Sequence, residues 1–405
     1  MHRLDERLAP LARLAVACAF AVAVFLGVGK ASAYPWMIRH AYTGCAMCHA
    51  DPTGGGVLTE YGRAQGDLLL RTKYKKVPEG QEDEPSSTAG FLWGAVKEPE
   101  WLSLGGSFRS MLMHNSVTGV PATNRYILME SDLKGFIKAS LFRAGASLGY
   151  AHEGARNAQV TSREADNLVA RQYWLGLAFK EDLWLVRAGR MNLPFGVRNV
   201  EHTLWVRRAT RTDINDGQQH GASIAYNGEK LRGEVMGIAG NYQVGPDAYR
   251  ERGWVGFAEY ALGERWAVGA NTLGTWALRD KATGVTTHRQ AHGLMLRGAV
   301  IEQVVLLAEA NMLLSAPAGV DQRYGFASML QADWEVKQGV HVLVTGETLK
   351  DAREGAKTSV GGWLSAWWFF LPHLDVRADA IVRNVPTPTG DVRATTLLFQ
   401  FHAYL

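Results

Sequence analysis

The chain has 405 residues, more than one ordinary domain needs, and 47% of them are hydrophobic, as in a packed protein rather than a disordered one. Its formal net charge is only +4, and basic and acidic residues are interspersed instead of forming blocks. We therefore expect no nucleic-acid partner.

The N-terminus has the pattern of a secretory signal peptide. Three arginines precede an apolar run over residues 14–28, and Ala31-Ser32-Ala33 supplies the small residues of a cleavage site. The apolar run is shorter than the roughly 20 residues that a membrane-spanning helix needs. We predict a signal peptide over residues 1–33, whose removal takes Cys18 away and leaves two cysteines in the mature protein.

Those two cysteines lie in Cys45-Ala46-Met47-Cys48-His49, the C-x-x-C-H pattern of c-type haem attachment. In this pattern the thiols of Cys45 and Cys48 add to the vinyl groups of the porphyrin, and His49 becomes the proximal iron ligand. A disulfide and a partial zinc site are the alternatives, but neither accounts for the histidine. The motif predicts one covalently bound haem c.

The sixth iron ligand is harder to assign, because residues 50–100 contain neither histidine nor methionine. We choose His40 as the distal ligand; the alternative is that it is an ordinary surface histidine. A five-coordinate iron stays open. The other candidates are Met37 just upstream and, on the first expected strand, Met111, Met113 and His114.

A glycine-rich turn follows the motif and leads into a possible short helix that ends near Leu70. The segment over residues 73–88 is charged and contains two prolines, as is typical of a linker. We therefore expect a small monohaem cytochrome c-type domain with its linker over residues 34–90 and a second domain over residues 91–405.

From Trp101 onward the chain consists of segments of about ten residues with alternating polarity, which is the signature of a transmembrane β-barrel. In Leu374–Arg383, for example, apolar residues share one face and charged residues the other. A soluble β-sandwich is the alternative. We predict sixteen antiparallel strands, near 101–114, 125–136, 140–152, 169–180, 183–191, 219–227, 231–241, 253–262, 265–277, 289–298, 303–313, 324–335, 339–349, 358–370, 373–383 and 393–405.

The connections support a barrel, because short turns and longer loops are expected to alternate strictly, as periplasmic turns and extracellular loops do. The last strand resembles the terminal strand of outer-membrane proteins, although those usually end in Phe and this chain ends in Leu405. The longest loop, over residues 192–218, carries Arg198, Arg207, Arg208 and Arg211. It either lines a charged passage, contacts a haem propionate, or is a solvated extracellular loop.

A single C-x-x-C-H motif behind a signal peptide, followed by a barrel of about sixteen strands, resembles the fused monohaem cytochrome c–porin family, which includes outer-membrane iron oxidases. Only Cys45, Cys48 and His49 carry over to specific roles. The segment over residues 187–196 is similar to general porin sequence, which supports the barrel but not iron, and Gly54–Gly56 is not typical of the iron oxidases.

The resemblance implies a location in the outer membrane of a Gram-negative bacterium and two possible functions. In the first, the chain is an electron conduit between an extracellular donor or acceptor, such as ferrous iron, and a periplasmic cytochrome, with the haem domain in or at the barrel lumen. In the second, the chain is a diffusion channel whose haem domain gates it or senses redox state or a ligand. An iron(II) oxidase activity is compatible with the first function, but no residue marks an iron site.

Overall fold

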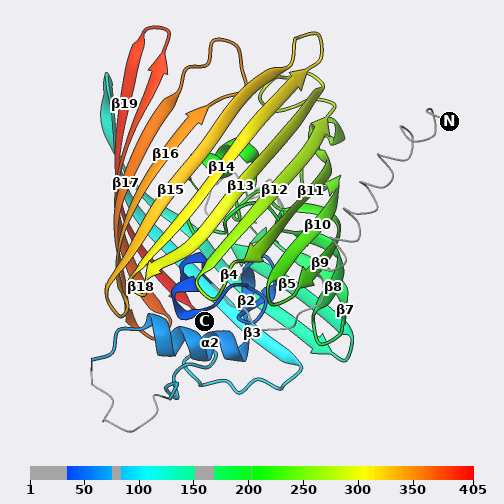
Figure 1. Cartoon of the computed structure of the whole chain (residues 1–405), viewed down its shortest axis with the longest axis vertical. Helices are drawn as coiled ribbons and strands as arrows, with labels where there is room; N and C mark the ends of the chain where they lie inside the picture. The colour runs from blue at the N-terminus through cyan, green and yellow to red at the C-terminus, as the bar shows by residue number, and fades with distance from the viewer. Residues whose placement is uncertain (1–33, 75–83, 151–167, 202) are drawn as a thin grey trace, which may run out of the picture.

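The computed structural model describes residues 34–74, 84–150, 168–201 and 203–405, so the predicted signal peptide lies outside the described residues. Nearly all of the chain beyond residue 100 belongs to one antiparallel β-barrel (Figure 1). Among the described residues, no helix is long and apolar enough to span a membrane. The barrel strands are β3 (Leu102–Val117), β4 (Val120–Ala139), β5 (Phe142–Tyr150), β6 (Leu168–Val169), β7 (Tyr173–Phe179), β8 (Trp184–Met191), β9 (Gln219–Asn227), β10 (Leu231–Gly240), β11 (Arg252–Ala261), β12 (Trp266–Ala277), β13 (Thr287–Ile301), β14 (Val304–Pro317), β15 (Arg323–Lys337), β16 (Val340–Lys350), β17 (Ser359–Leu371), β18 (Leu374–Thr387) and β19 (Gly390–Tyr404).

Each barrel strand pairs with its neighbours in the sequence, and β19 pairs with β3 to close the ring. The short segments β6 and β7 both pair with β5, so they are two parts of one interrupted strand. The seventeen strand segments of the ring therefore form sixteen strands, as predicted from the alternating pattern. Closure excludes the β-sandwich, because a sandwich has two separate sheets with open edges.

The two faces of the wall have opposite polarity. On β18, Asp375, Arg377 and Asp379 point into the barrel and are buried. On the outside, Leu330 and Leu364 are each 56% exposed, and similar apolar side chains cover the outer face of other strands. A soluble protein would bury these apolar groups, whereas a lipid-facing surface requires them outside.

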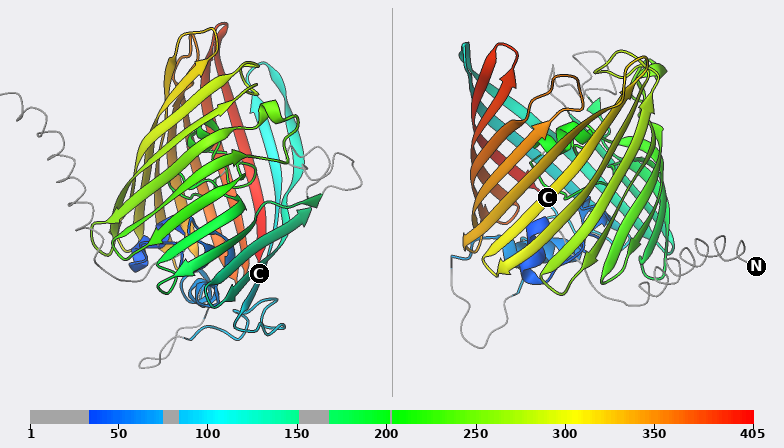
Figure 2. Two further views of the ribbon diagram at one scale, coloured as in Figure 1. Left: turned by 90° about the vertical axis from the view of Figure 1, so that its right-hand side faces the viewer. Right: turned by 45° about the horizontal axis from the view of Figure 1, so that its top comes forward.

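Loop lengths differ in one respect from the prediction of strict alternation. One end of the barrel has only short turns, while the other carries longer loops such as residues 192–218 and 241–251. Two connections at the loop end, residues 118–119 and 388–389, are nevertheless as short as the turns. The reason is that β3, β4, β18 and β19 are long and pair almost to their tips, so tight hairpins join them (Figure 2).

Residues 34–74 lie at the short-turn end, partly inside the barrel (Figures 1 and 2). The first helix packs on β13 and β14, and the small hairpin packs on β3 and β4. Farther along, Thr72 donates its backbone N–H to the carbonyl of Phe369 at 2.9 Å. The elements of this N-terminal segment are the 3₁₀ helix η1 (Pro35–His40), β1 (His49–Asp51), β2 (Gly55–Leu58), α2 (Glu60–Gln65) and the π-helical turn η2 (Gly66–Leu70).

Arg39 anchors η1 to the inner wall of the barrel. Its guanidinium pairs with Asp333, which is fully buried on β15, and with Glu335 at 3.0 Å. A buried ion pair of this kind is strongly destabilised when one partner is removed, because the other charge then stays buried and unpaired.

We expect Arg39→Ala to loosen η1 from the wall by about 3 kcal/mol or more, the usual cost of breaking a buried pair. Amide hydrogen exchange over residues 35–40 in the detergent-solubilised protein measures this local opening. The matched control is Arg323→Ala, which removes a surface pair with the largely exposed Glu354 and should cost less than about 1 kcal/mol. Equal exchange in both variants would contradict the anchoring role of Arg39.

Candidate functional site

The C-x-x-C-H residues form a tight turn at the entrance to β1. The backbone N–H groups of Cys48 and His49 both bond to the carbonyl of Cys45, at 3.2 and 3.0 Å. Both cysteines are buried, and neither forms a disulfide. The turn therefore places two thiols and an imidazole close together, which is the local geometry that haem attachment needs.

His49 has the hydrogen bonding of a ligand histidine. Its ring makes a hydrogen bond with the backbone of Gly55, while Nδ1 is buried and has no hydrogen-bond partner. Metal-ligating histidines usually bond a carbonyl through one nitrogen, which orients the ring and leaves the other for the metal. Burial lowers the pKa of His49 to about 4, so the ring is neutral at physiological pH, as iron ligation requires.

Helix α2 packs directly on the motif. Its N-cap residue, Thr59, donates its backbone N–H to the carbonyl of Cys48 at 2.9 Å and its hydroxyl to the carbonyl of Met47 at 2.6 Å. A Cβ at Gly62 would clash with the backbone of Cys48, so only glycine permits this approach. The short helix predicted after the glycine-rich turn is thus present, and it fixes the motif.

Charged residues of the barrel hold the motif from the other side. Arg187 on β8 pairs with Asp51 at 2.9 Å and with Glu234 on β10. Burial alone would raise the pKa of Asp51, but Arg187 and the backbone of Thr53 outweigh it and keep the pKa below its usual value. Arg232 on β10 donates to the sulfur of Cys45 at 3.3 Å. Asp51 therefore stays ionised, and the site is tied to the wall by charge.

Two cavities adjoin His49. One, of about 210 Å³, lies inside the lumen and has Met37, Cys48 and His49 in its wall, together with Gly54–Gly56. The other, of about 1770 Å³, opens between the motif and the turns at the short-turn end, and Met47 and His49 line it as well. The larger one exceeds the roughly 300–1000 Å³ of typical ligand pockets, so a large planar group attached at the motif has room.

His40 is not among the residues that line the two cavities beside His49. The charged neighbours of His40 are Glu335, Arg39, Glu302 and His341, on the β13–β16 side of the lumen. Of the alternatives, Met37 is in the wall of the smaller cavity together with His49. His114 instead bonds Asn124 near the barrel rim. Geometry therefore favours Met37 over His40, although the sixth ligand stays a prediction.

The long loop over residues 192–218 folds into the lumen and packs on the strands, unlike the predicted alternative of a solvated extracellular loop. It carries the helix α3 (Trp205–Thr210), which packs on β14, β15 and β16. Glu309 on β14 accepts the backbone N–H of Val197 at 2.7 Å and pairs with Arg207. A Cβ at Gly196, where φ is +65°, would clash with this pair. We call this segment the inward loop.

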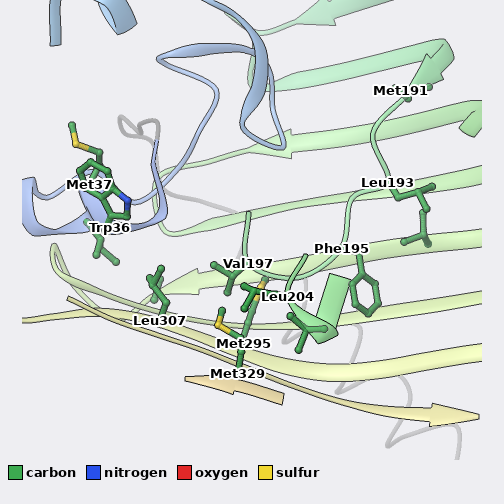
Figure 3. Close-up of a cluster of buried hydrophobic side chains, with 14 of the residues drawn as sticks. Trp36, Met37, Met191, Leu193, Phe195, Val197, Leu204, Met295, Leu307 and Met329 are labelled. Carbon is green, nitrogen blue, oxygen red and sulfur yellow. The ribbon is translucent and has the colours of Figure 1, made fainter. Parts of the chain in front are cut away.

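The inward loop and the N-terminal segment together place an apolar cluster inside the barrel. Figure 3 shows Trp36 and Met37 from η1 on one side and Leu193, Phe195 and Val197 from the inward loop on the other. Both groups meet lumen-facing side chains of the strands within one buried cluster. A water-filled porin lumen is polar, whereas this part of the interior is packed like a protein core. The strand residues labelled in the cluster are Met191, Met295, Leu307 and Met329.

Sequence reasoning missed the residues that fix both insertions. Arg39 and its partner Asp333 are 294 residues apart in the chain, and Glu309 and its partner Arg207 are 102 residues apart. No local sequence pattern reveals such pairs. The available signal was that Asp333 and Glu309 lie on the lumen-facing parity of their strands. Within the described part of the chain, no group of three or more His, Cys, Asp or Glu is arranged to hold a metal ion.

Comparison with protein-family profiles and with curated protein sequences finds no match. Among solved structures, the chain is similar to OmpT of Vibrio cholerae with loop L8 deleted, at TM-score 0.58 and 10% identity over 75% of this chain and 99% of that one. It is also similar to the outer membrane channel DcaP of Acinetobacter baumannii, at TM-score 0.56 and 10% identity over 78% and 99%. A third is the anion-selective porin of Comamonas acidovorans, at TM-score 0.53 and 13% identity over 75% and 99%. At this identity the likeness establishes the fold, a porin-like barrel.

We expect Glu309→Ala to release the inward loop, because it leaves Arg207 buried without a carboxylate and removes the acceptor of Val197. Breaking such a pair costs about 3–5 kcal/mol. The fraction of molecules whose inward loop has left the lumen therefore rises roughly 100-fold or more. Ion conductance of single molecules in planar bilayers measures the opening. Glu354→Ala, at the exposed pair with Arg323, is the control. A wild-type chain that already conducts like an open porin would refute the plugged lumen.

Proposed function

We propose that this chain is an outer-membrane electron conduit of the fused monohaem cytochrome c–porin type, with haem c attached at Cys45 and Cys48 and ligated by His49. The haem, when bound, supplies one-electron exchange. The protein passes electrons between a donor or acceptor outside the cell, with ferrous iron as a candidate donor, and a periplasmic cytochrome or other carrier. The resemblance of the motif and the barrel to this family supports the proposal.

The observation that carries the proposal is the packed lumen. Trp36 and Arg39 hold the N-terminal segment in the barrel, and the inward loop fills the lumen beyond it. A packed core would block diffusion through an open channel. An electron conduit instead needs its haem inside the barrel, because the apolar band of the barrel is roughly 25 Å tall. His49 lies inside the short-turn end, with the wide cleft beside it facing the side expected to be periplasmic.

The roles of the chain in this function follow from its contacts. The thiols of Cys45 and Cys48 would bind the haem covalently. The hydrogen bond of His49 to the backbone of Gly55 would orient its neutral ring toward the iron. Arg187 and Arg232 hold the motif against the wall. The apolar cluster fills part of the lumen and would restrict the passage of water and ions beside the haem.

A gated diffusion channel is the second candidate, and one observation favours it. The barrel is similar in fold to a channel and to an anion-selective porin. Against it, the lumen-facing arginines of the described residues are largely paired with carboxylates, for example Arg297 with Glu259 at 2.6 Å. Paired cations provide little field for attracting anions.

The function is tested with the full-length protein in liposomes that enclose oxidised cytochrome c. Ferrous iron, and separately a membrane-impermeant organic reductant, is added outside. We expect the enclosed cytochrome to be reduced and the conductance to stay low. Cys48→Ser should lose covalent haem, seen by haem staining of denaturing gels, and should lose transfer. Covalent haem with no transfer from either reductant would overturn the conduit, and high conductance would favour the channel.

The axial ligand is tested by absorption and magnetic circular dichroism spectra of the purified protein. We expect Met37→Ala to remove the signature of a sulfur-ligated iron and to open the site to carbon monoxide, because Met37 shares a cavity wall with His49. His40→Ala should leave the spectrum unchanged. A changed spectrum in His40→Ala alone would support His40 as the distal ligand. No change in either variant would indicate a five-coordinate iron or a ligand on β3, such as Met111 or Met113.

A further inference from the structure

The four arginines of the inward loop have different surroundings. Arg208 is exposed, and Arg207 and Arg211 form ion pairs with carboxylates of the barrel and its outer loops. Arg198 alone among them is in the wall of the lumenal cavity that His49 also lines. The structure thus singles out one arginine of the inward loop as facing the C-x-x-C-H segment.

Within the described part of the chain, Arg198 has no carboxylate at hydrogen-bond distance. Its Nη2 donates to the carbonyl of Leu193, and its Nη1 is buried without a partner. Burial lowers its pKa to about 10, so the guanidinium stays charged at neutral pH. Among the acidic groups, Asp51 has the largest electrostatic effect on it, but Asp51 is already bonded to Arg187 and Thr53. A guanidinium with a buried nitrogen left in this state is costly unless an anionic group completes its hydrogen bonds.

Two other cations of this cavity are paired with carboxylates. Arg171 pairs with Asp132, and Lys134 pairs with Glu130 at 2.8 Å. Arg109, on β3, has Glu130 as an acidic neighbour, but Glu130 already pairs with Lys134. Arg198 differs from Arg109 in having a buried nitrogen without a partner, so it offers a vacant donor for an anion in the cavity.

We propose that Arg198 binds a propionate carboxylate of the haem attached at Cys45 and Cys48. This inference rests on the proposed function. A propionate supplies two oxygens in a plane, which match the fork of a guanidinium. Cys48 and His49 line the same cavity as Arg198. A propionate of a haem attached at the motif and the unpartnered Nη1 of Arg198 therefore belong to one site. The contact joins the inward loop to the haem.

The contact has a measurable electrostatic effect. Reduction adds one electron to the haem, and a nearby protonated arginine stabilises the reduced form more than the oxidised one. Removing the charge therefore lowers the reduction potential. Loss of the hydrogen bond also changes the propionate itself, which a purely structural role of Arg198 would not do.

The test compares Arg198→Gln, Arg198→Lys and the matched control Arg208→Gln, each as the full-length protein in detergent. Spectroelectrochemical titration gives the haem potential, and resonance Raman gives the propionate bending mode. We expect Arg198→Gln to shift the reduction equilibrium about tenfold toward the oxidised form, 59 mV for one electron, and to move the bending mode. Arg208→Gln should match the wild type, and Arg198→Lys should keep the potential but move the mode.

An unchanged bending mode in both Arg198 variants would overturn the contact, whatever the potential does. If Arg198→Gln fails to assemble, Arg198→Lys decides: a moved mode supports the contact, and an unmoved mode overturns it. Absence of covalent haem from the wild type would refute the proposed function itself. That result is distinct from a wild type that carries haem while its Arg198 variants behave like Arg208→Gln.

Discussion

The ion pair between Arg39 and the inner wall of the barrel anchors the start of the N-terminal segment inside the short-turn end. A sixteen-stranded barrel encloses more space than its own side chains fill, so the lumen is either water-filled or occupied by other parts of the chain. Arg39 reaches two carboxylates of β15, and the apolar side chains of η1 bury themselves beside it. The placement of the C-x-x-C-H turn follows, because only eight residues separate His40 from His49.

The inward loop occupies the lumen by the same physical means. Glu309 satisfies a backbone donor and a guanidinium of the loop, and apolar residues on either side of this contact pack against the strands. A charge pair sets the position, and apolar burial adds stability, at roughly 25 cal/mol per Å² removed from water. The two insertions share one apolar cluster, so displacing either one exposes the surface of the other.

Sequence patterns predicted the strands of the barrel far better than the contacts of the segments that lie inside its lumen. Strand positions follow from alternating polarity, which each segment carries locally, and the structure confirms sixteen strands to within a few residues. The C-x-x-C-H motif located the candidate site for the same reason. The partner of Arg39, the inward fold of residues 192–218 and the surroundings of His40 depend on pairings between distant residues. A single sequence does not encode these locally, so three alternatives for the loop stood open.

The N-terminal segment and the barrel belong to one polypeptide, and this has a consequence for stoichiometry. A separate small protein would have to find its barrel by diffusion, and at low abundance many barrels would stand without one. A short tether instead gives the segment an effective concentration on the order of millimolar at its own binding surface. Every barrel is therefore synthesised with one N-terminal segment of its own, and no barrel is left with an empty lumen that leaks solutes.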